Sequence, residues 1–81
     1  MRVRTDISGQ NLIKLLKKKF EYEISRQTGS HIRVTSLKNG QHHITIPNHN
    51  PIKIGTLNGI ISDIAEHFEL SKSEIIAELF S

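Results

Sequence analysis

Five histidines are the side chains of this 81-residue sequence best suited to proton transfer, because imidazole titrates closest to neutral pH. The absence of cysteine excludes a thiol nucleophile, a disulfide and a cysteine-ligated zinc site. Four of the histidines lie between positions 31 and 49, a clustering that raises the question of a metal site. Their spacing matches no familiar zinc motif, and no acidic residue lies near them in the sequence. We therefore expect no metal and no other cofactor.

His31 has the most informative position of the five. It follows Gly29-Ser30, a turn whose amides and hydroxyl could receive a phosphate, and Arg33 is two residues further along. RNA cleavage needs little more than this, because the substrate supplies its own nucleophile, the 2′-hydroxyl, and one imidazole moves the proton. The residues alone leave two interpretations of His31 open, a proton-transfer group and a surface side chain without a task.

Hydrophobic periodicity predicts which elements position these residues. An amphipathic helix is expected from about residue 9 to 18, with Ser8 as its N-cap. Alternation of period two then predicts three strands, over residues 20–28, 31–37 and 42–46, the first of them half-buried. A long apolar stripe predicts a helix with Thr56 as its N-cap, and the capping box Ser71-Lys72-Ser73-Glu74 opens a last short helix.

The alternation of the second and third strands also predicts their pairing. A three-residue loop of Lys38, Asn39 and Gly40, with a left-handed Gly40 and an adjacent bulge, pairs apolar residues with apolar residues. In this register one sheet face is polar. It carries His31, Arg33, Thr35, His43 and Thr45, and the predicted pairs are Ile32 with Ile46, Arg33 with Thr45, and Val34 with Ile44.

The predicted order is α-β-β-β-α with a C-terminal helical extension. It indicates an α+β fold, a two-layer sandwich like that of double-stranded-RNA-binding domains. A chain this short supports one core, so residues 1–81 are expected to form a single domain.

Charge is distributed unevenly along the chain. Residues 1–53 carry ten basic and three acidic side chains, whereas residues 54–81 carry one basic and five acidic side chains. The basic part suits a polyanion such as RNA. No apolar run approaches the length of a membrane span and no signal-peptide pattern opens the chain, so we expect a cytoplasmic protein without a membrane partner.

Four short motifs together resemble the HicA family of mRNA interferase toxins, from about residue 7 to residue 80. They are Ser8-Gly9-Gln10, Gln27-Thr28-Gly29-Ser30-His31, Ile46-Pro47-Asn48-His49 and Gly55-Thr56-Leu57. The resemblance implies a double-stranded-RNA-binding-domain-like fold, cleavage of mRNA, and neutralisation by a cognate HicB antitoxin. It places the family's catalytic histidine at His31 and the motif's glycine at Gly29. Many relatives have a second histidine at the next position, where this chain has Ile32.

The resemblance and the residues together predict a metal-independent endoribonuclease with His31 as general acid or base. Gly29, Ser30, Arg33 and Lys53 are the predicted RNA contacts, and a solvated lysine is the alternative interpretation of Lys53. The protein is expected to be a monomer when free and a hetero-oligomer with its antitoxin.

The sequence leaves three questions open. His43 is a candidate for a second catalytic group, whereas His49 is interpreted more readily as part of the loop structure. A non-catalytic RNA-binding module is the alternative function for the whole chain, and a protein-interaction domain is a third class.

Overall fold

The computed structural model describes residues 6–80. Residues 1–5 and 81 lie outside the described part. The prediction about a signal peptide rests mostly on residues 1–5, so it falls outside the described residues as well. No helix of the described part is both long enough and apolar enough to cross a membrane. The elements in chain order are α1 (Gly9–Phe20), β1 (Glu23–Thr28), β2 (His31–Ser36), β3 (His42–Pro47), α2 (Ile54–Phe68) and α3 (Lys72–Leu79).

Helix α1 begins where the sequence predicts. The Ser8 hydroxyl accepts a hydrogen bond of 3.1 Å from the backbone N–H of Asn11, which satisfies one amide that the helix itself leaves unpaired. The helix continues past its predicted end near residue 18, because Phe20 is buried on the same face as Leu12 and Leu16. The chain leaves the helix at Glu21, in the left-handed conformation.

The sheet is antiparallel throughout, with the strand order β1-β2-β3. The predicted pairing of β2 with β3 is confirmed, since Ile32 lies opposite Ile46 and Val34 lies opposite Ile44. All four of these side chains are buried. The side chains between them therefore lie on the opposite, open face of the sheet.

The loop between β2 and β3 differs from the prediction in two respects. Pairing stops at Ser36 and His42, so the loop spans residues 37–41, and the ladder has no bulge. Asn39 joins Gly40 at positive φ, with values of 59° and 91°. The Asn39 side chain donates a hydrogen bond of 2.9 Å to the carbonyl of His67. This contact ties the turn to the end of α2.

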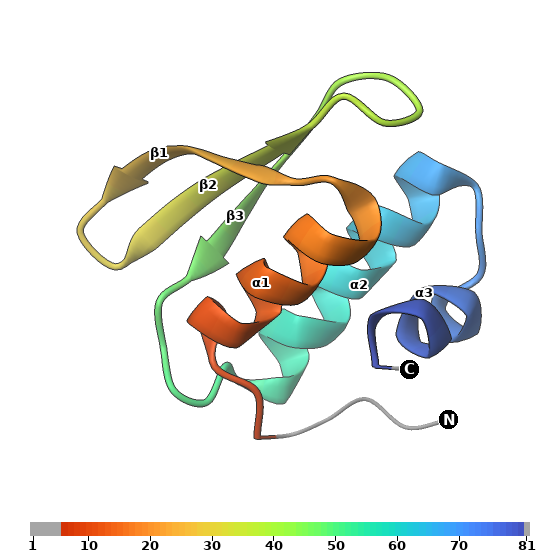
Figure 1. Ribbon diagram of the computed structural model, residues 1–81. Helices are drawn as coiled ribbons and strands as arrows, with labels where there is room; N and C mark the ends of the chain where they lie inside the picture. Colours follow the sequence, from red (N-terminus) through yellow and green to blue (C-terminus); the bar gives the residue numbers. More distant parts are fainter. Residues whose placement is uncertain (1–5, 81) are drawn as a thin grey trace.

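The prediction that the first strand is half-buried is wrong. Every residue of β1 is exposed, and Ile24 is 54% exposed. Tyr22 is fully buried but precedes the strand. A bulge between Ile24 and Arg26 breaks the alternation. β1 is an edge strand, and its far end extends past the helices (Figure 1).

Helix α2 begins at Ile54, with Lys53 as its N-cap, and the prediction of Thr56 as the cap is wrong. Just before the helix, Ile52 is buried and its N–H donates to the Ile7 carbonyl at 2.9 Å. These contacts of Ile52 favour a helix that begins before Thr56. They outweigh the stabilisation of about 1 kcal/mol that a Thr56 side-chain cap would provide. Thr56 therefore lies in the first turn.

Helix α3 begins with the predicted capping box. The Ser71 hydroxyl accepts from the Glu74 N–H at 3.1 Å, and the Glu74 carboxylate accepts from the Ser71 N–H at 2.9 Å. The second of these bonds lowers the pKa of Glu74, because it is made to the charged carboxylate.

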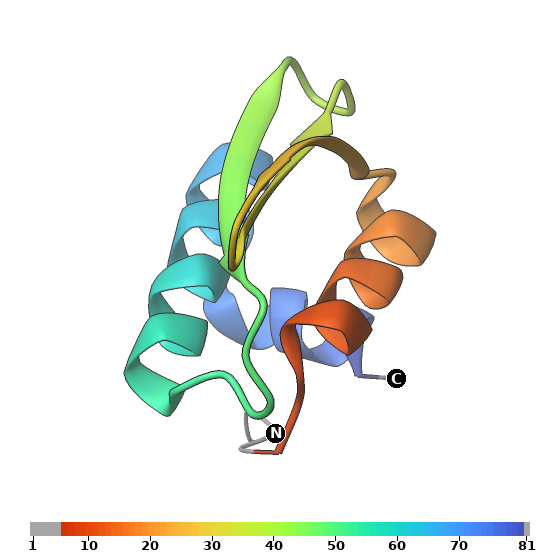
Figure 2. The ribbon, with the colours of Figure 1, turned by 90° about the vertical axis from the view of Figure 1, so that its left-hand side faces the viewer.

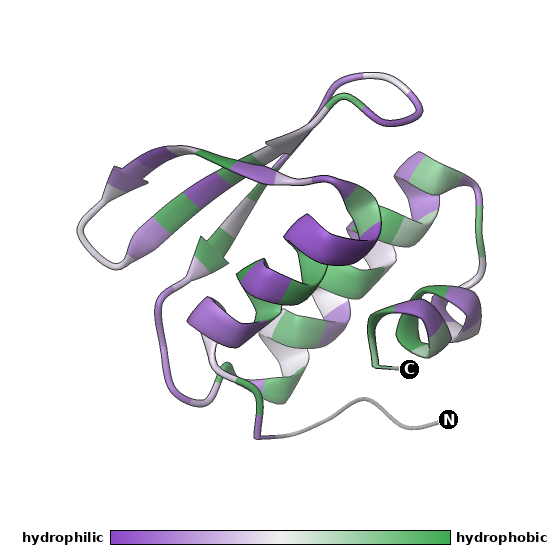
Figure 3. Cartoon of the chain, viewed as in Figure 1, coloured by the Kyte–Doolittle hydropathy of each residue, from purple (hydrophilic) through white to green (hydrophobic). Residues whose placement is uncertain are grey.

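The core lies between the sheet and the helices. Figure 2 shows α1 and α2 on the two sides beneath the sheet, with α3 closing the space between them. Hydrophobic residues alternate along the strands and form stripes on the helices (Figure 3). The fold is the predicted α+β arrangement, α-β-β-β-α with a helical extension, as in double-stranded-RNA-binding domains.

Candidate functional site

His31 begins β2, directly after a two-residue turn. Thr28 pairs with His31, so Gly29 and Ser30 form the turn, and Gly29 has a φ of +57°. A Cβ at Gly29 would meet no neighbour, so glycine is favoured there by its backbone conformation and not by space. The imidazole at the start of β2 is exposed.

His31 lines a pocket of about 350 Å³ at this end of the sheet. That size lies within the usual range for ligand pockets of about 300 to 1,000 Å³. The lining comes from β2, β3, the loop after β3 and the start of α2. Its residues are His31, Thr45, Pro47, His49, Lys53 and Thr56.

The predicted site residues divide into two groups in the structure. His31 and Lys53 line the pocket together, and Thr45, which lines it too, pairs with Arg33 across the sheet. Arg33 therefore neighbours the pocket on the same sheet face without lining it. Gly29 and Ser30 shape the adjacent turn and do not line the pocket.

Backbone contacts hold the walls of the pocket. The Asn48 N–H donates to the Ser30 carbonyl at 2.7 Å, which ties the loop after β3 to the turn before His31. The Gly9 N–H donates to the His49 carbonyl at 2.9 Å. A Cβ at Gly9 would collide with the carbonyl oxygen of Pro47, so only glycine allows α1 to approach this loop so closely.

Motifs far apart in the sequence therefore meet at this pocket. Gln10 adds a hydrogen bond of 3.2 Å from its side-chain amide to the Asn48 side chain. The Gly9 motif supports the loop, the Gly29 motif supplies His31, the Pro47 motif supplies His49, and the Gly55 motif supplies Thr56. The four sequence motifs thus all contribute residues to this pocket or to the loop that borders it.

The electrostatics of the pocket favour an anion. Lys53 is the charged side chain among those lining it, and no carboxylate lines it. The first turn of α2 contains no acidic residue, and Lys53 provides no side-chain cap for the amides there. Such amides and the helix dipole attract negative groups.

His43 lies on the same sheet face as His31 but outside the pocket, opposite Thr35 near the other end of β2. The Ser25 hydroxyl donates to the Arg33 carbonyl at 3.2 Å, and the Thr35 hydroxyl donates to the Ser25 oxygen at 2.9 Å. Both hydroxyl protons are then used. Thr35 therefore accepts from Nδ1–H of His43, at 2.7 Å.

His42 and His67 form part of a hydrogen-bonded cluster at the end of the sheet away from the pocket. Asp63 accepts from Nε2–H of His42 at 3.1 Å, which leaves Nδ1 to accept from the Tyr22 hydroxyl at 2.7 Å. Burial, and to a lesser extent the charge of Asp63, raise the pKa of Tyr22. The His67 ring stacks on His42, with centroids 4.3 Å apart.

The same cluster also fixes the loop between β2 and β3. Nε2–H of His67 points at the carbonyls of Lys38 and Gly40, at 3.0 and 3.1 Å. Sequence reasoning did not find this cluster. The spacing of Asp63 and His67, four residues apart on one face of α2, is the signal that could have indicated it.

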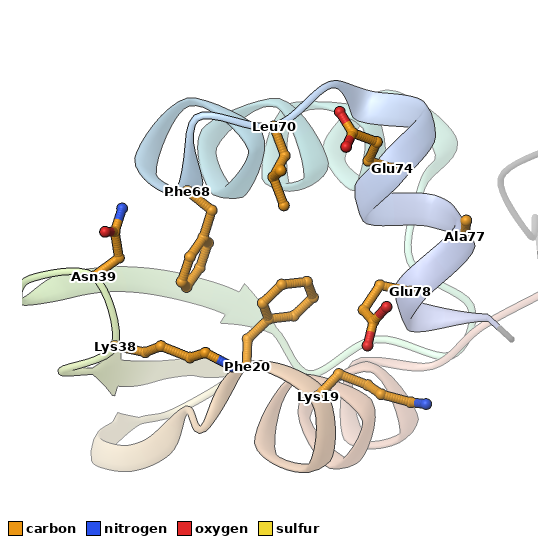
Figure 4. Close-up of a pocket in the computed structure, with 9 residues that line it drawn as sticks. All are labelled: Lys19, Phe20, Lys38, Asn39, Phe68, Leu70, Glu74, Ala77 and Glu78. Atoms are coloured by element: carbon orange, nitrogen blue, oxygen red, sulfur yellow. The ribbon is translucent and has the colours of Figure 1, made fainter.

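A larger pocket of about 660 Å³ lies between α1, the end of α2 and α3 (Figure 4). Phe20, Phe68 and Leu70 point into it, and the two phenylalanine rings are 4.9 Å apart. No histidine lines it. Its charged rim includes Glu74, which is engaged in the capping box of α3. This pocket offers apolar surface and lacks a group suited to proton transfer near neutral pH.

Sequence reasoning interpreted His49 more readily as loop structure than as a catalytic group, and in the structure His49 is one of the residues that line the His31 pocket. The predicted register brings only the end of the third strand close to His31. Extended to the end of the strands, it pairs His31 with Pro47, two residues before His49. Thr45 and Thr56 were likewise not predicted as pocket residues.

A comparison with protein families matches the part of the chain that contains these motifs. Residues 9–65 match the family described as HicA toxin of bacterial toxin-antitoxin. Neither curated proteins nor solved structures gave a match to the chain. The family match covers well over half of the sequence and spans the elements that build the His31 pocket. The chain belongs to the HicA family and is a toxin of a toxin–antitoxin system.

Proposed function

We propose that this toxin is an endoribonuclease that cleaves mRNA, with His31 as a general acid or base. The observation that carries the proposal is the pocket itself, in which the predicted histidine and Lys53 meet residues of the other family motifs. A pocket lined by imidazole, hydroxyl and ammonium groups suits a phosphodiester and its ribose.

The reaction follows from the chemistry of the substrate. The ribose 2′-hydroxyl attacks the neighbouring phosphorus, the bond to the leaving 5′-oxygen breaks, and the products are a 2′,3′-cyclic phosphate and a 5′-hydroxyl. His31 either accepts the proton of the 2′-hydroxyl or delivers one to the 5′-oxygen. One such transfer contributes about 10²- to 10⁴-fold in rate.

The remaining predicted residues serve to hold the RNA. Lys53 and the first turn of α2 face the pocket and suit the scissile phosphate. Arg33 lies beside Thr45 on the open sheet face, where it suits a neighbouring phosphate. Gly29 and Ser30 form the turn that would border the RNA strand.

No metal ion is assigned a role in this reaction. Within residues 6–80 no group of three or more histidine and carboxylate side chains is arranged to hold one. The proposed reaction is metal-independent, and its test is cleavage in excess chelator, which we expect to match cleavage without it.

A HicB-like antitoxin is the proposed partner, and it would neutralise the toxin by covering the open face that carries His31. Acidic groups on the antitoxin would complement the basic first part of the chain. The free toxin is proposed to be a cytoplasmic monomer that forms a hetero-oligomer with this partner.

The test is induction of the wild type and His31→Ala in a bacterial host, with growth and mRNA integrity followed together. We expect only the wild type to arrest growth and fragment mRNA, leaving 5′-hydroxyl ends. Cleavage by His31→Ala at the wild-type rate, or 5′-phosphate ends, would contradict the proposal. RNA that is bound but never cleaved would support a binding module.

A further inference from the structure

We infer that His49 is the second acid–base group of the reaction, so that His31 and His49 act as a pair on the two oxygens of one phosphodiester. This inference rests on the proposed function and assigns the group that assists His31. It starts from the observation that both histidines line one pocket of about 350 Å³.

The backbone places His49 there independently of its side chain. Its carbonyl accepts from the Gly9 N–H, and its neighbour Asn48 donates to the Ser30 carbonyl. The two segments that carry the histidines are thus tied together one residue from each imidazole. The His31 and His49 rings make no hydrogen bond with another side chain within residues 6–80, which leaves both free to exchange protons with a substrate.

The other residues of the pocket are poor proton-transfer groups near neutral pH. Thr45 and Thr56 carry hydroxyls, Pro47 carries no titratable group, and Lys53 carries an ammonium group. Lys53 suits charge stabilisation better than proton transfer. His49 is the lining residue, other than His31, whose side chain type switches protonation state near neutrality.

His43 is the alternative second group, and its position disfavours it. It pairs with Thr35, whereas His31 pairs with Pro47 at the other end of the same two strands. Thr35 and His43 are thus four residues along their strands from the His31 pair, about 13 Å away at strand spacing. One phosphodiester does not span that distance.

The paired step balances its protons. One imidazole starts neutral and accepts the 2′-hydroxyl proton as the bond between the 2′-oxygen and phosphorus forms. The other starts protonated and gives its proton to the 5′-oxygen as the bond between phosphorus and that oxygen breaks. Such a pair gives a bell-shaped dependence of rate on pH, with one limb for each group.

The first experiment measures the cleavage rate of purified protein on RNA from pH 4.5 to 9. The variants are His31→Ala, His49→Ala and His49→Asn, with His43→Ala as a matched histidine control outside the pocket. We expect His49→Ala and His49→Asn to lose about 10²- to 10⁴-fold in rate and to lose one limb of the bell. His43→Ala should keep both limbs, and thermal unfolding establishes that each variant is folded.

The second experiment identifies the oxygen that each imidazole serves. After the wild-type cleavage site is mapped, a short RNA is made with sulfur replacing the 5′-oxygen at that bond. A thiolate leaves without a proton donor, so the variant that lacks the general acid should recover with this substrate. We expect recovery in one of His31→Ala and His49→Ala, and not in both.

The outcomes separate this inference from the function on which it rests. If His31→Ala cleaves like the wild type, the proposed function falls. If His31→Ala is inactive while His49→Ala keeps its rate and both limbs, only the inference falls. It falls as well if His49→Ala is slow but keeps both limbs, because His49 would then be a positioning residue.

Discussion

The two ends of the sheet use histidine in opposite ways. At the pocket end, His31 and His49 line a cavity, and the backbone holds the segments that carry them. At the other end, His42 and His67 are themselves the connections, because their rings join Tyr22, Asp63 and the loop carbonyls. His42, His67, Tyr22 and Asp63 together form a histidine cluster at that end of the sheet.

This difference separates structural histidines from those available for chemistry. A ring whose two nitrogens are both engaged has no free site for a substrate proton, and His42 is in that state. At the pocket end the same stabilising task is done by amides and carbonyls, as between Gly9 and His49. Substitutions of the pocket histidines should therefore reduce catalysis with little effect on folding, whereas substitutions in the histidine cluster should reduce stability with little effect on catalysis.

The largest effect on folding is expected where the backbone support of the pocket is broken. In Gly9→Ala the new Cβ collides with the Pro47 carbonyl, a backbone group that cannot rotate away. We expect a loss of about 3 kcal/mol in the free energy of unfolding, the upper part of the range for overpacking. Because the displaced loop carries His49, RNA cleavage should fall as well. Urea unfolding and the cleavage rate measure the two effects.

The matched control is Gly59→Ala in α2, where a Cβ meets no neighbour. That variant should gain about 0.5 to 1 kcal/mol, because alanine favours a helix interior. If Gly9→Ala is as stable as the wild type, the close approach of α1 to this loop does not support the pocket.

The sequence is sufficient to predict most of the fold, because periodicity and register are local properties. The Ser8 cap, the pairing of β2 with β3 and the capping box of α3 are confirmed. The start of α2 was mispredicted because a tertiary contact of Ile52 outweighs the local preference for Thr56. The exposure of β1 was mispredicted because a bulge has no clear signal in the sequence.

The candidate site was predictable only in part, for the same reason. His31 could be identified from its motif and Lys53 from its place before a helix, and both line the pocket. The position of His49 depends on how the loop after β3 packs on Gly9 and Ser30, which no local pattern contains. The histidine cluster depends on α2 lying against the loop between β2 and β3.

A smaller effect is expected from His42→Ala in the histidine cluster. This change removes the acceptor of the Tyr22 hydroxyl, and Tyr22 is fully buried. An unsatisfied buried hydroxyl costs about 1 to 3 kcal/mol, so we expect a loss of about 2 kcal/mol in the free energy of unfolding. Cleavage by the folded variant should match that of the wild type, measured well below its unfolding temperature. A large loss of cleavage rate in folded His42→Ala would contradict the distinction between structural histidines at one end of the sheet and catalytic ones at the other.

The smallest effect at neutral pH is expected from Tyr22→Phe, which becomes informative at alkaline pH. Near pH 7 the lost hydrogen bond to His42 should cost about 1 kcal/mol. Burial raises the pKa of Tyr22 in the folded protein, whereas in the unfolded chain the pKa of the phenol is about 10. Below that pH both states keep the proton, and the stabilisation by Tyr22 is complete.

Above about pH 10 the unfolded chain loses the phenol proton while the folded protein keeps it, so the wild type should lose up to about 1.4 kcal/mol per pH unit from this group. Tyr22→Phe lacks that dependence, and the stability difference between the two proteins should narrow between pH 9 and 11. Urea unfolding at both pH values measures the narrowing. Tyr22 is the single tyrosine of the chain, so its absorbance reports its ionisation directly. Ionisation near pH 10 in the folded protein, with parallel stability curves, would show that the phenol is not held by the histidine cluster.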